Sequence, residues 1–320
     1  MAISATETPA VIVRDTSLRD GLQNIARVVP TEIKLEWMQG LYEAGFREIE
    51  VGSFVPPKLM PQLADTAQIV AAAKKLPGVL VSVLVPNLRG ATSALEHGAD
   101  LMLLPLSASH THSLANLRKT PDEVVEEVRR IRAEIDAAGS DCVLEIGIST
   151  AFGCTIQGRV EPQEVVRLVQ AVLDAGADAI SLADTVGYGD PRQVRALFEQ
   201  TFAVAGERLV CGHFHDTRGL GLANVMAALD TGITRFDACV AGIGGCPHAP
   251  GASGNVNSED LVYMLHSMGL PTGVDFDRLL ALRSRVTQWL DGERFQGSVW
   301  QAGLPKTMLE DAKEQEKVVA

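Results

Sequence analysis

Short hydrophobic runs alternate with longer amphipathic segments along almost the whole chain. The hydrophobic runs are rich in valine, isoleucine and leucine, which is typical of parallel strands buried on both faces. They recur about every 30 residues, and eight are predicted as strands: 11–14, 48–51, 80–85, 101–104, 142–148, 179–182, 209–214 and 236–240.

The segments between these runs place apolar residues at helical spacing. They predict helices at 31–44, 62–74, 88–97, 121–137, 162–175, 191–203, 222–229 and 258–267. Gly45 and Gly98 directly follow two of them, where a left-handed residue commonly ends a helix.

Eight strand–helix units predict an α/β protein with a (β/α)8 TIM barrel. We expect residues 1–272 to form the barrel and residues 273–320 to form a short C-terminal helical extension, which caps the barrel or packs on a partner. The alternative is an open, doubly wound sheet. It is disfavoured because no glycine-rich phosphate loop follows the first strand.

Bulk properties exclude several classes of partner. The 320 residues carry a net charge of −12, which argues against nucleic acid and anionic membranes as partners. No apolar run is long enough to cross a membrane. The five cysteines are odd in number and the first ten residues lack targeting features, so we expect a reducing, cytoplasmic setting.

Side chains capable of chemistry collect where the predicted strands end, and the carboxyl ends of barrel strands carry the active site. They are Arg19, Asp20, Glu50, Asp184, His213, His215 and Cys246. We therefore predict one active site at this end of the barrel.

His213 and His215 are two residues apart in a strand, so both rings point to one face. Asp20 and Asn255, also near strand ends, add oxygen ligands. This mixed set predicts a divalent cation, with Mg²⁺ or Mn²⁺ favoured over Zn²⁺ or Co²⁺. The alternative is a pair of histidines that only make hydrogen bonds in the core.

Two further residues suit a reaction that builds negative charge. Arg19 beside Asp20 can stabilise charge that develops on an oxygen. Cys246 follows glycines in a loop, where an exposed thiol can transfer protons, although an incidental thiol in a tight turn is the alternative.

The other cysteines and two histidines are weaker candidates. Cys142, Cys211 and Cys239 lie in strands and are expected in the core, whereas the position of Cys154 stays open. His110 and His112 are expected to be solvated loop residues rather than substrate contacts.

Several segments together resemble the 3-hydroxy-3-methylglutaryl-CoA lyase family, in the same order and over residues 11–272. They are 19–24 (RDGLQN), 53–58 (SFVPPK), 213–217 (HFHDT), 242–247 (GIGGCP) and 251–255 (GASGN). Isopropylmalate and homocitrate synthases, in the wider superfamily, share the first and third elements. The GGCP segment indicates the lyase branch.

The resemblance implies cleavage of 3-hydroxy-3-methylglutaryl-CoA to acetyl-CoA and acetoacetate with Mg²⁺ or Mn²⁺, by a homo-oligomer that serves leucine degradation and ketone-body metabolism. The residue roles that it implies are metal binding by Asp20, His213, His215 and Asn255; enolate stabilisation by Arg19; proton transfer through Glu50, Asp184 and Cys246; and substrate binding by Gln23, Asn24 and Ser53.

The chain departs from the family at Ile25, Ala26 and Glu145, where the family commonly has charged residues and an Arg-Gly-Tyr motif. An unpaired glutamate would repel the distal carboxylate of the substrate. We therefore expect poor use of the methylglutaryl ester, or a preference for a related ester such as citramalyl-CoA. Alternatively, Glu145 points into the helix layer and never meets substrate.

Two other functions remain open. One is an acyl-CoA condensing synthase of the isopropylmalate type, which is disfavoured by the absence of an added regulatory domain and by the cysteine loop. The other is a non-catalytic barrel that acts as a binding partner. It predicts the loss of a metal-binding or proton-transfer residue, and none is missing.

Overall fold

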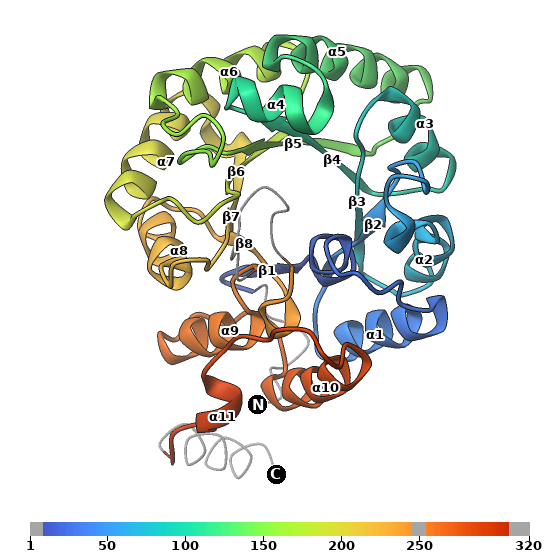
Figure 1. Cartoon of the computed structure of the whole chain (residues 1–320), viewed down its shortest axis with the longest axis vertical. Helices are drawn as coiled ribbons and strands as arrows, with labels where there is room; N and C mark the ends of the chain where they lie inside the picture. The colour runs from blue at the N-terminus through green and yellow to red at the C-terminus, as the bar shows by residue number, and fades with distance from the viewer. Residues whose placement is uncertain (1–8, 245–253, 307–320) are drawn as a thin grey trace.

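The computed structural model describes residues 9–244 and 254–306, and its strands close into a parallel barrel in sequence order (Figure 1). The strands are β1 (Ile12–Asp15), β2 (Glu48–Ser53), β3 (Leu80–Leu84), β4 (Leu101–Ser107), β5 (Val143–Ser149), β6 (Ala179–Asp184), β7 (Leu209–Phe214) and β8 (Arg235–Ala238). The predicted TIM barrel is confirmed, and the open sheet is excluded because β1 pairs with β8.

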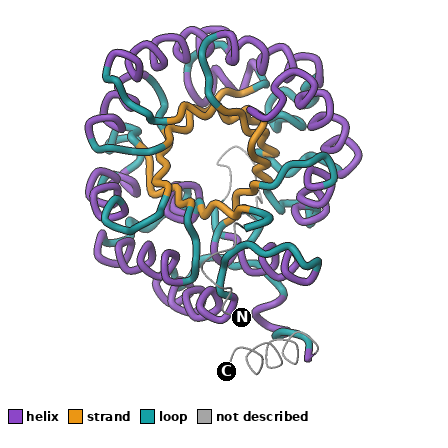
Figure 2. Tube along the Cα trace, turned by 180° about the vertical axis from the view of Figure 1, so that it is seen from behind, coloured by secondary structure: helices purple, strands orange, loops and turns teal. Residues whose placement is uncertain are grey.

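Helices form a ring around the strands, as the view from behind shows clearly (Figure 2). They are α1 (Thr31–Glu43), α2 (Thr66–Ala73), α3 (Leu88–Glu96), α4 (His110–Leu117), α5 (Pro121–Ala137), α6 (Pro162–Asp174), α7 (Pro191–Ala205), α8 (Gly221–Leu229), α9 (Ser258–Ser267), α10 (Phe276–Trp289) and α11 (Val299–Ala302). None of the helices in the described ranges is long and apolar enough to span a membrane.

The predicted periodicity explains why these segments are helical. In α5, Thr120 and Glu123 form a capping box at the N-terminus. Val124, Val128 and Ile131 follow at intervals of three and four residues and are fully buried against the barrel. Burial of this apolar stripe is therefore what fixes α5 on the sheet.

Helix α4 was not predicted, and it changes the interpretation of one histidine. Ser109 caps its N-terminus by accepting the backbone N–H of His112. His110 is exposed, as expected, but His112 is buried and its Nδ1 lies 2.7 Å from the Ser107 hydroxyl. The expectation that His112 is solvated was wrong.

The expected C-terminal extension begins with α10, which lies between α1 and α9 (Figure 1). Leu279, Leu282 and Val286 form its buried stripe. Arg283 lies beside them and is also buried. This helix completes the outer ring rather than standing apart from it.

An ion-pair network crosses the barrel interior, a region that aliphatic side chains usually fill. The Arg14 guanidinium of β1 donates to both oxygens of Glu145 on β5, at 2.8 and 3.0 Å. It also donates to Asp237 on β8, at 2.7 and 3.1 Å. Burial alone would lower the pKa of Arg14, but the carboxylates of Asp237 and Glu145 raise it by more than burial lowers it. Arg14 therefore stays charged.

This network corrects the expectation for Glu145. The side chain is fully buried, paired with Arg14, and directed into the barrel rather than into the helix layer. Glu145 is therefore not an unpaired charge that could repel a substrate carboxylate, and the reason for doubting the methylglutaryl ester falls away.

Candidate active site at the barrel mouth

A single π-helical turn, η1 (Ser17–Gly21), follows β1 and carries two of the predicted residues. The Thr16 carbonyl accepts the backbone N–H groups of both Arg19 and Asp20, which holds the turn tightly at the strand end. Arg19 and Asp20 are each only 5% exposed, so both side chains are buried at the mouth rather than solvated.

Asp20, His213 and His215 come together, with one ligand atom from each lying within 4.8 Å of the others. The two histidine Nε2 atoms are 3.1 Å apart, and His215 Nε2 lies 3.5 Å from Asp20 Oδ2. Asn255 joins them by donating from Nδ2 to Asp20 Oδ2 at 2.6 Å. All four residues predicted as ligands therefore converge.

The convergent groups fit a divalent cation. One buried atom in the cluster, Oδ1 of Asn255, has no hydrogen-bond partner among the described residues. Unpartnered buried polar atoms are costly and call for an explanation. A carboxylate, two imidazoles and an amide oxygen form a mixed donor set that such ions accept.

Arg19 forms ion pairs with two carboxylates beside the cluster, Glu50 and Asp20. Its Nε donates to Glu50 at 2.7 Å, and its NH1 contacts Asp20. Burial alone would raise the pKa of Asp20, but Arg19 and then the histidines lower it well below its usual range. Burial raises the pKa of Glu50, and Arg19 only partly offsets this.

Asp237 orients His213 and was missed by sequence reasoning. Its Oδ2 lies 3.0 Å from His213 Nδ1, and the two residues are register partners on neighbouring strands. Burial tends to raise the pKa of Asp237, but Arg14 and His213 bring it below its ordinary value. A carboxylate on Nδ1 leaves Nε2 free to face a metal.

Asp184 supports the loop that follows β6. Its carboxylate accepts the backbone N–H groups of Tyr188 at 2.8 Å and Gly189 at 3.0 Å. Burial raises the pKa of Asp184, and these hydrogen bonds offset part of the rise. The side chain thus joins the barrel mouth to an adjacent surface loop.

The expected substrate-binding residues differ in their surroundings. Gln23 donates from Nε2 to Asp20 at 2.8 Å, and Asn24 is exposed. Ser53 is buried, and its hydroxyl accepts the backbone N–H of Val55. Ile25, one of the family departures, packs in the core.

The predicted proton-transfer residue Cys246 lies outside the described residues. The expectation that Cys142, Cys211 and Cys239 are core residues is confirmed, since all three are buried. Cys154 is buried too, and its sulfur accepts backbone N–H groups of the loop after β5.

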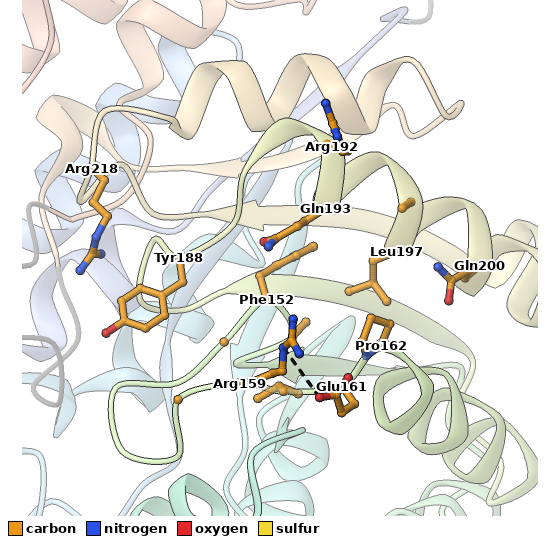
Figure 3. Close-up of a pocket in the computed structure, with 15 residues that line it drawn as sticks. Phe152, Arg159, Glu161, Pro162, Tyr188, Arg192, Gln193, Leu197, Gln200 and Arg218 are labelled. Carbon is orange, nitrogen blue, oxygen red and sulfur yellow. Dashed lines mark ion pairs between the residues drawn. The ribbon is translucent and has the colours of Figure 1, made fainter.

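A surface groove of about 650 Å³ lies between the loop after β5 and helix α7 (Figure 3). Arg159, Arg192 and Arg218 line it together with the aromatic residues Phe152 and Tyr188. The Arg218 guanidinium lies over the Tyr188 ring, 4.5 Å from its centre. Glu161 also lines the groove and pairs with Arg159 at 3.8 Å (Figure 3), so Arg192 and Arg218 supply the positive charges that no lining carboxylate pairs with.

The chain is similar to known proteins in both sequence and structure. A model of the HMGL-like family matches residues 10–286. The hydroxymethylglutaryl-CoA lyase, mitochondrial, of Arabidopsis thaliana is 40% identical over 92% of this chain, which spans 62% of that protein.

A Pseudomonas aeruginosa relative, 3-hydroxy-3-isohexenylglutaryl-CoA/hydroxy-methylglutaryl-CoA lyase, is 38% identical over 84% of this chain and 89% of its own length. Among solved structures, an HMG-CoA lyase of Acinetobacter baumannii in complex with coenzyme A and 3-methylmalate has a TM-score of 0.86 and 39% identity. That alignment covers 92% of this chain and 95% of the other.

Proposed function

The chain belongs to the HMGL-like family, and from this premise we propose that it is a divalent-metal-dependent carbon–carbon lyase acting on a 3-hydroxyacyl-CoA. The main candidate is 3-hydroxy-3-methylglutaryl-CoA, cleaved to acetyl-CoA and acetoacetate. The observation that carries the proposal is the convergence of Asp20, His213, His215 and Asn255 beside the buried Arg19.

Asp20, His213, His215 and Asn255 would hold the cation, with Mg²⁺ or Mn²⁺ as the expected ion. Arg19 keeps Asp20 ionised, and Asp237 orients His213, so both ligands are prepared before any ion binds. When bound, a divalent cation would lower the pKa of the tertiary hydroxyl of the substrate.

The chain's own residues account for the movement of protons and charge. The hydroxyl proton leaves as the C–C bond breaks, and Glu50, whose Oε1 has no hydrogen-bond partner in the described structure, is a buried carboxylate able to take it. The electron pair of the broken bond moves into the thioester enolate, where Arg19 stabilises the oxygen. Cys246 then returns a proton to carbon, and Asp184 supports this transfer.

The structure also bears on the choice of ester. Arg14 neutralises Glu145, so nothing at that position disfavours a distal carboxylate. We therefore propose that the methylglutaryl ester is a good substrate. The Pseudomonas relative is named for a bulkier ester as well, so the 3-substituent is the variable to test.

The test is to incubate the protein with a panel of 3-hydroxyacyl-CoA esters, including the methylglutaryl, isohexenylglutaryl and citramalyl esters, and to identify products by mass. Mg²⁺ or Mn²⁺ is added to one set and a chelator to the other. We expect acetyl-CoA and acetoacetate from the methylglutaryl ester only with metal.

A separate reaction with acetyl-CoA and a 2-oxo acid tests the condensing alternative. Consumption of both, without cleavage of any ester, would replace the proposal with a synthase function. The absence of any reaction would favour the non-catalytic barrel. The cytoplasmic setting and the homo-oligomeric state stay predictions.

A further inference from the structure

Ala241, three residues after the end of β8, has an unusual backbone conformation. Its φ is 60° and its ψ is 14°, in the left-handed region that alanine rarely adopts. A non-glycine residue persists there only when surrounding groups hold it. The groups that hold Ala241 come from α9 and the C-terminal segment.

Glu259 of α9 supplies the first contact. Both of its carboxylate oxygens accept the backbone N–H of Ala241, at 3.0 and 3.1 Å, and the side chain is fully buried. Arg283 of α10 donates to the same carboxylate at 3.1 Å and is only 2% exposed. Burial raises the pKa of Glu259 to about 7, and the positive charge of Arg283 offsets part of that rise.

Gln296, beyond α10, supplies the remaining contacts. Its backbone N–H donates to the Ala241 carbonyl at 2.8 Å, and its side chain donates to the Gly242 carbonyl at 3.3 Å. The other end of the Arg283 guanidinium donates to the Gln296 carbonyl at 2.6 Å. Arg283 therefore joins Glu259 and Gln296 into one clamp on Ala241 and Gly242.

Ile243 and Gly244, the residues that follow the clamp in the chain, pack on the metal-binding cluster. Asn255 donates from Nδ2 to the Ile243 carbonyl at 3.3 Å. A Cβ on Gly244 would lie 2.8 Å from Asn255 Nδ2 and 3.0 Å from the Asp20 carbonyl, so only glycine fits there. A Cβ on Gly254 would clash with the Gly242 carbonyl. The Ala241–Gly242 backbone is therefore one of the supports of Asn255, beside the bridge between Asn255 and His215.

We propose that Arg283 and Gln296 are positioning residues for the divalent-cation site, and that they act through Glu259 and the Ala241–Gly242 backbone to place Asn255. The inference rests on the proposed metal-binding function. It gives the C-terminal extension a role in the site, although neither Arg283 nor Gln296 touches the cluster.

The experiment measures the affinity of the purified protein for Mn²⁺ alone, by electron paramagnetic resonance titration. Arg283→Met should weaken binding about 10-fold or more, the usual effect of losing a group that orients a ligand. Arg283→Lys keeps the positive charge but cannot donate to Glu259 and Gln296 at the same time, so an intermediate loss of Mn²⁺ affinity is expected. The matched control is Arg285→Met on the same helix, whose exposed partner is Glu36, and it should bind Mn²⁺ like the wild type.

A second comparison separates positioning from general destabilisation. If Arg283 acts through Asn255, Arg283→Met should cause no further loss of Mn²⁺ affinity in an Asn255→Ala background, because the coupled contact is already gone. A purely structural role would lower the melting temperature equally in both backgrounds and leave the Mn²⁺ affinity of Arg283→Met unchanged. That unchanged affinity would overturn the inference.

If Arg283→Met does not fold, Arg283→Lys and Gln296→Ala decide the question, and wild-type affinity in both would overturn the inference. A wild-type protein that binds no Mn²⁺ would instead overturn the proposed metal-binding function, and the inference with it. The two failures are thus distinguishable in one set of titrations.

Discussion

Replacing Asp237 with asparagine removes one buried negative charge between Arg14 and His213. In the native protein the carboxylate accepts from Arg14 and holds the proton of His213 on Nδ1, at 3.0 Å. The asparagine amide can accept from Arg14 or donate toward His213. When it donates, the histidine proton is favoured on Nε2, the atom that faces Asp20 and His215.

Two magnitudes follow from this geometry. The loss of a carboxylate behind a histidine ligand typically weakens metal binding about 10–100-fold, or roughly 1.4–2.7 kcal/mol. The protein should also lose about 1.5–3 kcal/mol of unfolding free energy, the usual contribution of a hydrogen bond to a charged group. The larger cost of a fully unpaired buried ion does not apply, because Glu145 still pairs with Arg14.

The assay combines Mn²⁺ titration with urea unfolding, and Glu145→Gln is the matched control. That variant removes the other partner of Arg14 without touching His213, so it should lose similar stability but keep wild-type Mn²⁺ affinity. An Asp237→Asn protein that binds Mn²⁺ as tightly as the wild type would refute the orienting role. Equal losses of affinity in the two variants would mean that the ion network, not His213, controls binding.

Four further outcomes are expected. Chelation should abolish turnover and Mn²⁺ should restore it, whereas His215→Ala should stay inactive after metal is added; turnover by the metal-free protein would contradict this. Cys246→Ser should lower the turnover rate about 10²–10⁴-fold with unchanged Mn²⁺ affinity, and wild-type turnover would make the thiol only structural. Glu145→Arg should prevent folding, seen as insoluble protein, because it faces Arg14 inside the barrel; a folded variant with altered ester preference would restore the original reading of Glu145. Burial raises the pKa of Asp15 from 3.8 to about 7. The contribution of Asp15 to the free energy of unfolding is therefore complete below about pH 4 and is lost as the pH rises through 7. Asp15→Asn should remove that pH dependence from urea unfolding measured between pH 4 and 8, and identical slopes in the two proteins would contradict it.

The barrel could be predicted from sequence because each strand is a separate apolar run and each helix has a regular stripe. Where this apolar pattern is interrupted or too short, the predicted elements were wrong. Pro105 and Ser107 interrupt the apolar run of β4, so the predicted strand ended at residue 104 although the structure extends it to Ser107. Helix α4 has no long apolar stripe, and its histidines resembled loop residues.

The metal-binding cluster was predictable because its histidines share one strand face and its other members follow strand ends. The interior ion network was not, because Arg14 lies 131 residues from Glu145 and 223 from Asp237 in sequence. Only closure of the barrel brings these residues together. The available signal was a charged residue within a short apolar strand, as at Glu145 in β5.

The same limit applies to the C-terminal segment. Arg283 interrupts the apolar stripe of α10, which indicates a buried partner but does not identify it. Glu259, its partner, stands in the first turn of α9, where acidic residues are common for reasons of the helix dipole alone. Sequence reasoning therefore had no means of joining the two.

The most direct test of the central claim is cleavage of 3-hydroxy-3-methylglutaryl-CoA in deuterated water with Mn²⁺, followed by mass analysis of the products. The proposed enolate takes its proton from an exchangeable group, so acetyl-CoA should carry one deuterium in its methyl group and appear in equal amount with acetoacetate. His215→Ala should form neither product. Acetyl-CoA without deuterium, or no cleavage by a protein that binds Mn²⁺, would contradict the proposed lyase reaction.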